Sequence, residues 1–131
     1  MLPRFAIVTL FALAGCAHPV IRPALRAPNP NGCYAIIYEN PGFEGAGDVL
    51  NGPTRLPLLE QVPQTNEVNW QRRIRSLRVG STATVTVYAQ TAFKGYSRRF
   101  EPGTERPQLE PALSAQIQSL DVVCLERTGL P

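Results

Sequence analysis

The strongest constraint on the fold is a short pattern that occurs twice. The stretches "YENPGFEG" at residues 38–45 and "YAQTAFKG" at residues 88–95 place a tyrosine, a phenylalanine and a glycine at identical spacing. Farther along, each copy is followed by the closing pattern Ile-x-Ser-Leu, at residues 74–77 and 117–120. The chain therefore repeats one order of parts: a strand, an aromatic and glycine element, a variable middle and a final strand.

Short strand signals dominate the region that contains this repeat. Residues 82–90 alternate alanine and valine with threonine, the period-two pattern of a strand with one buried face. Residues 33–39 are rich in β-branched and aromatic side chains and precede an Asn-Pro-Gly turn signal. Further strands are expected at residues 74–79, 96–101 and 117–125, and single helical turns at residues 57–62 and 111–116. This pattern predicts an all-β antiparallel sandwich.

The two repeats together resemble the βγ-crystallin family. The resemblance covers residues 33–125, with motif one at about 33–80, motif two at about 81–125, and a tail at 126–131. It implies two Greek-key motifs packed as a sandwich of two four-stranded antiparallel sheets. In the family, a folded hairpin joins the first two strands, its glycine has a positive φ, an aromatic pair covers it, and a serine hydroxyl bonds it to the last strand.

The resemblance assigns these architectural roles residue by residue. The matching positions are Tyr38, Phe43, Gly45 and Ser76 in the first motif and Tyr88, Phe93, Gly95 and Ser119 in the second. The repeated letters are therefore interpreted as a folding device rather than a duplicated binding site.

Many microbial βγ-crystallins bind calcium through the signature Asn/Asp, Asn/Asp, any residue, Ile/Val, Ser/Thr and Ser, which supplies hard oxygen ligands. The corresponding segments here are "QRRIRS" at residues 71–76 and "SAQIQS" at residues 114–119. Ligand positions are replaced at Arg72, Arg75, Ala115 and Gln118. We therefore predict no calcium site of the family type. Ser114 and Gln118 leave a weak site in the second segment as the alternative.

The N-terminal segment resembles a bacterial lipoprotein signal. Arg4 precedes an apolar run at residues 5–14, about half the ~20 residues that a membrane-spanning helix needs. The Leu-Ala-Gly-Cys sequence at residues 13–16 resembles a lipobox, in which the cysteine is acylated, for example with palmitate, and the chain is cut before it. We expect a signal peptide at residues 1–15 and lipid on Cys16. An ordinary signal peptide with an incidental cysteine is the alternative.

The residues after Cys16 favour an outer-membrane tether. Ala17 replaces the aspartate that retains lipoproteins at the inner membrane in enteric-type bacteria. Four prolines within residues 16–32 disfavour a helix or a central strand and favour an extended tether. The expected location is the bacterial cell envelope, with the lipid in the outer membrane and the domain in the periplasm.

Cys33 and Cys124 lie at the first and last strand signals of the domain. An exported environment is oxidising enough for them to pair, and the bridge would close almost the whole domain. We predict this disulfide. Two buried free thiols are the alternative.

Charge and residue content exclude several function classes. Without residues 1–15 the chain has 12 basic and 10 acidic residues, a balance that does not favour nucleic acid. The only histidine, His18, lies in the tether, so neither a Ser-His nor a Cys-His pair can form within the domain. We predict no enzymatic activity and no cofactor. Trp70 is expected to fill the core.

The densest charge cluster is the candidate partner-binding patch, with a solvated strand and loop as the alternative. It contains Arg72, Arg73, Arg75 and Arg78. The favoured function is a lipid-anchored module that binds a protein or an envelope component. The alternatives are an inhibitor or immunity protein against a hydrolase or toxin, a structural stress-resistance protein, and a calcium-binding domain with a degenerate site.

Overall fold

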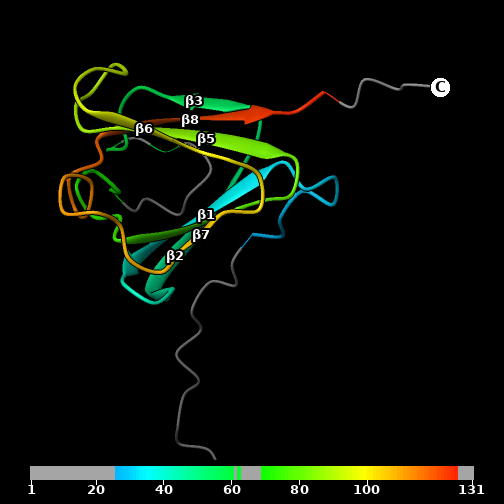
Figure 1. Cartoon of the computed structure of the whole chain (residues 1–131), viewed down its shortest axis with the longest axis horizontal. Helices are drawn as coiled ribbons and strands as arrows, with labels where there is room; N and C mark the ends of the chain where they lie inside the picture. Colours follow the sequence, from blue (N-terminus) through cyan, green and yellow to red (C-terminus); the bar gives the residue numbers. More distant parts are fainter. Residues whose placement is uncertain (1–25, 61, 63–68, 127–131) are drawn as a thin grey trace, which may run out of the picture.

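The computed structural model describes residues 26–60, 62 and 69–126 of the chain (Figure 1). The predicted signal peptide, Cys16 and residues 17–25 of the tether lie outside these residues. Within the described ranges, no helix is long and apolar enough to cross a membrane. The strands there are β1 (Tyr34–Asn40), β2 (Glu44–Asn51), β3 (Thr54–Leu56), β4 (Ser76–Val79), β5 (Ala83–Tyr88), β6 (Ser97–Phe100), β7 (Glu105–Arg106) and β8 (Ser119–Cys124).

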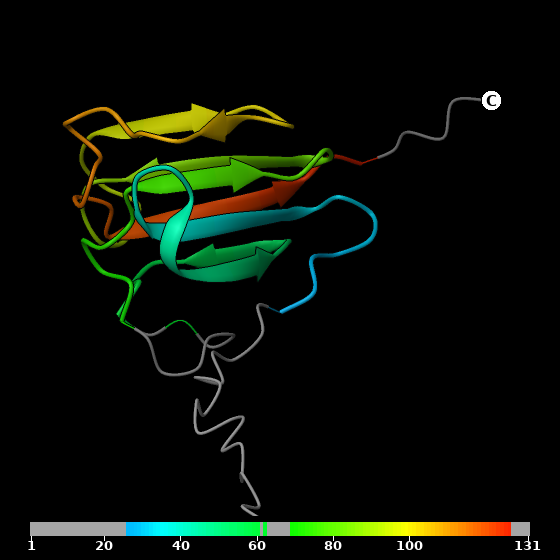
Figure 2. The ribbon, with the colours of Figure 1, turned by 90° about the horizontal axis from the view of Figure 1, so that it is seen from below.

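These strands form two four-stranded sheets that pack as two layers (Figures 1 and 2). The first sheet has the order β2-β1-β4-β7 and the second the order β3-β8-β5-β6, with every neighbouring pair antiparallel. Each repeat places three strands in one sheet and its third strand in the other. The predicted sandwich of two four-stranded antiparallel sheets is confirmed.

Five of the strands coincide with strand signals in the sequence, and three were not predicted. The unpredicted strands are β2, β3 and β7. The strand β2 has two glycines and an exposed first half, so it lacks the alternation that identifies a half-buried strand. The strands β3 and β7 have three and two residues and pair with the opposite repeat.

The segments expected to make single helical turns form turns in the structure. Within residues 111–116, the Ser114 amide donates to the Glu110 carbonyl oxygen at 2.9 Å, but the segment does not continue into a helix. The other segment, residues 57–62, contains a turn at residues 59–60, and residue 61 lies outside the described residues.

A buried serine pins the folded hairpin between β1 and β2. The Ser76 hydroxyl donates to the Asn40 carbonyl oxygen at 2.6 Å and accepts the Phe43 amide at 3.1 Å. The Tyr38 and Phe43 rings meet edge to face with centroids 5.6 Å apart. Gly45 has φ 78°, a conformation that a Cβ atom disfavours.

The second repeat reproduces this arrangement between β5 and β6. Ser119 donates to the Gln90 carbonyl oxygen at 2.6 Å and accepts the Phe93 amide at 3.1 Å. The rings of Tyr88 and Phe93 lie edge to face at 5.5 Å, and Gly95 also has φ 78°. The aromatic and glycine element is therefore one folding device used twice.

The predicted disulfide between Cys33 and Cys124 is confirmed, with the two Cα atoms 5.4 Å apart. Cys33 precedes β1 of the first sheet, and Cys124 ends β8 of the second, so the bridge joins the two layers. Gly52 lies against it: a Cβ atom there would stand 2.7 Å from the Cys33 sulfur. Only glycine fits this position without displacing the bridge.

The core lies between the sheets and includes Trp70, which is 1% exposed. Trp70 therefore fills the core, as expected from the sequence. Its indole N–H donates to the Asp48 carboxylate on β2 at 2.5 Å, which pairs the one polar atom of the ring.

We expect Ser76→Ala and Ser119→Ala each to lower the free energy of unfolding by about 1–3 kcal/mol, because the buried amide and carbonyl of the hairpin lose their partner. Denaturant unfolding of the oxidised protein measures this. Ser97→Ala, at an exposed position on β6, is the matched control. A loss no larger than that of the control would contradict the role of the serines.

Candidate functional site

Three of the four arginine side chains in the predicted patch have partners among the described residues. Arg73 forms an ion pair with the Glu39 carboxylate at 2.6 Å, and Arg75 donates to the Glu39 carbonyl oxygen at 3.0 Å. Arg78 pairs with Glu105 and lies over the Phe43 ring. The fold thus brings Arg73 and Arg75 together on Glu39 and places Arg78 at another contact.

The two segments that match the calcium signature contact each other across the molecule. The Arg72 amide donates to the Ile117 carbonyl oxygen, and the Ala115 amide donates to the Ile74 carbonyl oxygen, both at 2.9 Å. Arg72 and Ala115 also share a left-handed φ of 57°. The segments are therefore equivalent under an approximate twofold relation between the repeats.

Side-chain N–H groups stand where the signature would supply ligating hydroxyls. Arg75 donates to the carbonyl oxygen of Glu39, and the Gln118 amide donates to that of Ala89 at 2.8 Å. Glu39 and Ala89 each follow the repeated tyrosine, so the two contacts are equivalent. The described residues contain no group of three or more His, Cys, Asp or Glu side chains placed to hold a metal ion. The carbonyl oxygens of Glu39 and Ala89 thus already accept hydrogen bonds from these side chains.

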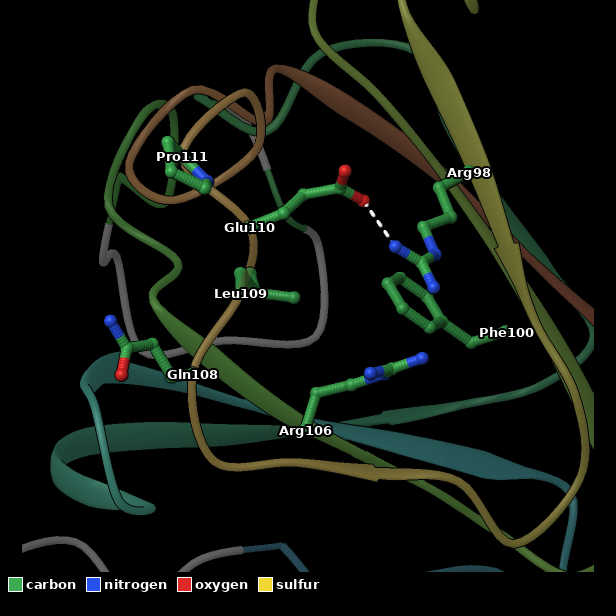
Figure 3. Close-up of a pocket in the computed structure, with 7 residues that line it drawn as sticks. All are labelled: Arg98, Phe100, Arg106, Gln108, Leu109, Glu110 and Pro111. Atoms are coloured by element: carbon green, nitrogen blue, oxygen red, sulfur yellow. Dashed lines mark hydrogen bonds and ion pairs between the residues drawn. The ribbon is translucent and has the colours of Figure 1, made fainter.

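An open cleft of about 330 Å³ lies between the edge strands β6 and β7, and the loop that follows β7 forms its third wall (Figure 3). It is lined by Arg98, Phe100, Arg106, Gln108, Leu109, Glu110 and Pro111. The Phe100 ring lies between the side chains of Arg98 and Arg106, and Leu109 lies across from it (Figure 3). Charged groups thus surround an apolar floor.

One carboxylate in the cleft is held from two sides. Arg98 pairs with one Glu110 oxygen at 2.6 Å, and the Tyr96 hydroxyl donates to the other at 3.0 Å. The hydrogen bond from Arg98, followed by that from Tyr96, lowers the pKa of Glu110. Glu110 is therefore ionised at neutral pH and committed to Arg98.

The second guanidinium, that of Arg106, has no such partner. Its Nε atom is buried without a hydrogen-bond acceptor in the part of the chain that the structure describes. Its Cζ atom lies 5.8 Å from the centroid of the Phe100 ring, while that of Arg98 lies 5.6 Å from the same centroid. Arg106 is thus held against an aromatic ring with its Nε–H unpaired.

The strand register shows which way the side chain of Arg106 faces. Arg106 on β7 lies opposite Leu77, whereas the equivalent position in the other sheet, opposite Leu120, is Leu56 on β3. Leu56 is 6% exposed and belongs to the core. Arg106 therefore occupies a core-facing position at the edge of the first sheet.

The connecting loops differ between the two halves. Residues 57–75 join β3 to β4, whereas a shorter segment, residues 107–118, joins β7 to β8. Trp70 and Leu113 occupy equivalent turns, since the amide three residues after each donates to its carbonyl. In the first half the Trp70 indole reaches Asp48 on β2, whereas in the second half Arg98, at the equivalent position on β6, lines the cleft.

No model of a known protein family matches the chain, and no curated protein matches it. Solved structures do match. One is a domain from work on the evolution of the eye lens βγ-crystallin domain fold, with TM-score 0.63 and 20% identity over 77% of this chain and 95% of that one. The protein has the βγ-crystallin fold.

Bacterial βγ-crystallin domains match as well. A domain from Clostridium beijerinckii has TM-score 0.57 and 23% identity, covering 68% of this chain and 95% of its own. One from Flavobacterium johnsoniae has TM-score 0.58 and 16% identity, covering 74% of this chain and 98% of its own. At these identities the likeness concerns the fold.

Sequence reasoning missed the cleft of this βγ-crystallin fold. A signal for part of it was present, because Arg98 and Phe100 are two positions apart in a strand and therefore share a face. The positions of Arg106 and Glu110 depend on pairing with distant strands and carried no local signal.

We expect millimolar calcium to leave the melting temperature unchanged relative to a chelator, because Arg75 and Gln118 replace the ligating hydroxyls of the signature and donate to the carbonyl oxygens of Glu39 and Ala89. Differential scanning calorimetry of the oxidised protein checks this. A calcium-dependent rise of several degrees would show that the segments still bind the ion.

Asp48 occupies on β2 the position equivalent to Arg98 on β6. Burial raises the pKa of its carboxyl above the ordinary 3.8, although the hydrogen bond from Trp70 opposes the shift. The folded state therefore binds the proton more tightly than the unfolded state does. Ionisation of Asp48 consequently costs stability as the pH rises from 3.8 through the folded pKa.

We expect Asp48→Asn, which keeps an oxygen acceptor for Trp70, to gain stability relative to wild type as the pH rises from 4 to 7. Urea unfolding of both proteins across this pH range measures the difference. A difference that stays constant or falls with rising pH would contradict the raised pKa.

Proposed function

We propose that the protein is an exported, lipid-anchored and non-enzymatic binding module of the bacterial cell envelope. Its ligand, a protein or an envelope component, binds in the cleft between β6 and β7. The observation that carries this proposal is the guanidinium of Arg106, which lines the cleft and forms no ion pair among the described residues. A cation placed in a cleft without an acidic partner favours a ligand that supplies the negative charge.

Export is supported by the disulfide, because such bridges persist in oxidising compartments. The lipid on Cys16 rests on the sequence pattern alone. An extended tether over residues 17–32 would reach up to ~50 Å in polyproline geometry, at ~3.1 Å per residue. The domain would then meet ligands at some distance from the membrane surface.

The chemistry of the cleft supports binding rather than catalysis. Its carboxylate, Glu110, has a lowered pKa and is engaged by Arg98 and Tyr96, so it is a poor general base. The lining residues include neither a second carboxylate nor a histidine. An acid and base pair for hydrolysis is therefore not assembled there.

Lipid anchoring is tested by metabolic labelling with palmitate in a bacterial host, followed by membrane fractionation. We expect wild type to incorporate label and to sediment with membranes, and Cys16→Ser to do neither. Label in the variant, or release of wild type into the soluble fraction, would contradict the anchor.

Binding is tested in living cells with a photo-crosslinking amino acid at Gln108, an exposed position at the cleft. The control places the same group at Lys94, in the exposed turn between β5 and β6. We expect a discrete adduct from position 108 and none from position 94. Equal labelling at both, or none at either, would overturn the binding role of the cleft.

A further inference from the structure

We infer that the cleft between β6 and β7 recognises a carboxylate, which Arg106 binds while an adjoining apolar group of the ligand packs on Phe100 and Leu109. This inference rests on the proposed function, because it names the ligand class of the same cleft. Four observations carry it: the register of Arg106, the pairing of the surrounding acids, the geometry of a guanidinium, and the charge of the opposite wall.

Folding does not require an arginine at position 106. The equivalent position in the other sheet is Leu56, which completes the core there by apolar burial alone. Arg106 instead leaves a buried Nε without an acceptor, which is a cost to the folded state. Arg106 thus costs stability at a position where Leu56 contributes it, which points to a role of Arg106 in function rather than in folding.

The neighbouring acids are all engaged with other arginines. Glu101 pairs with Arg99 at 3.3 Å, and Glu105, adjacent to Arg106, pairs with Arg78 across the strands. Glu110 pairs with Arg98 at 2.6 Å. Arg106 is therefore the cation of this region that forms no ion pair among the described residues, although its charge helps to lower the pKa of Glu110, and the cleft has one positive charge in excess.

The guanidinium of Arg106, which lines the cleft, matches a carboxylate. Its two Nη groups form a planar fork that pairs with the two oxygens of a carboxylate, while the buried Nε stays in the protein. One carboxylate supplies one negative charge, which equals the excess of the cleft. A phosphate dianion would exceed it and face the ionised Glu110 on the opposite wall, which is unfavourable.

The size and floor of the cleft define the rest of the ligand. A volume of about 330 Å³ is near the lower end of small-molecule sites, so one residue-sized group fits. The apolar contact offered to that group is narrow, because Phe100 and Leu109 line the cleft but are each only 3% exposed. The carboxylate can belong to the C-terminus of a peptide or to an acidic side chain, and both sources present the same chemistry.

The test is a titration of the isotope-labelled chain, as purified from bacteria, followed by nuclear magnetic resonance at the Arg106 Nε–H signal. The probes are N-acetyl-leucine for a terminal carboxylate, N-acetyl-glutamate α-amide for a side-chain carboxylate, N-acetyl-leucinamide as the uncharged control, and inorganic phosphate. We expect one or both carboxylates to shift the signal saturably, and the more effective one identifies the source.

Variants separate recognition from folding. Arg106→Leu places the counterpart residue at this position and should keep or raise the melting temperature while weakening carboxylate binding about ten- to a hundredfold, monitored at Leu109. Arg106→Lys keeps the charge but loses the fork and should bind more weakly than wild type. Arg99→Leu, an exposed arginine on the same strand as Arg98, should bind like wild type.

Several results would overturn the inference. These are saturable binding of the uncharged amide with equal affinity, tighter binding of phosphate than of either carboxylate, unchanged binding in Arg106→Leu, and no shift with any probe. The crosslinking experiment keeps this outcome distinct from the proposed function. An adduct at position 108 without carboxylate binding would refute the ligand class alone.

Discussion

The buried hydroxyls of Ser76 and Ser119 make the interaction on which the rest of the structure depends. Each accepts an amide from a phenylalanine, Phe43 or Phe93, whose φ is close to 60°. That conformation is costly for a bulky side chain and persists only where the surroundings determine it. The serine therefore bonds the strained residue itself, and the tyrosine contact holds its ring. Together these contacts hold the hairpin folded back over the sheet.

The residues of this corner follow a fixed local spacing in the sequence, so the sequence alone predicts the sandwich. The strained corner, its glycine and its serine are specific residue types at fixed spacing, so two copies identify the sandwich. The third strand of each repeat has no such signal. Because β3 pairs with β8 and β7 pairs with β4, each is defined by a strand of the other repeat. Two or three residues contain too little periodicity to show this pairing.

The cleft could not be predicted from the sequence for a related reason. The cluster at residues 72–78 is dense in sequence, but the acids that pair with Arg73 and Arg78 lie 34 and 27 positions away. The cluster therefore presents less free positive charge than its sequence suggests. Conversely, Arg106 looks like one more surface arginine until the register places it opposite Leu77. Only the comparison of the two halves, Leu56 against Arg106, shows that its position faces the core.

The same comparison separates what the fold requires from what it leaves open. On the outer faces, both halves form an ion pair between neighbouring strands, with the arginine and the acid exchanged between the strands. Arg78 on β4 pairs with Glu105 on β7, while Arg55 on β3 pairs with Asp121 on β8.

In both cases the arginine covers the phenylalanine of the corner, at 3.7 Å from Phe43 and 4.3 Å from Phe93. The sign of the charge on each strand is reversed, yet the contact is kept, so the corner requires it. At the inward-facing positions of the same strands the two halves differ. Leu56 on β3 packs in the core, whereas Arg106 on β7 lines the cleft. This inward difference, Leu56 against Arg106, lies at the wall of the cleft, which is where a fold with one binding site would depart from the match between its halves.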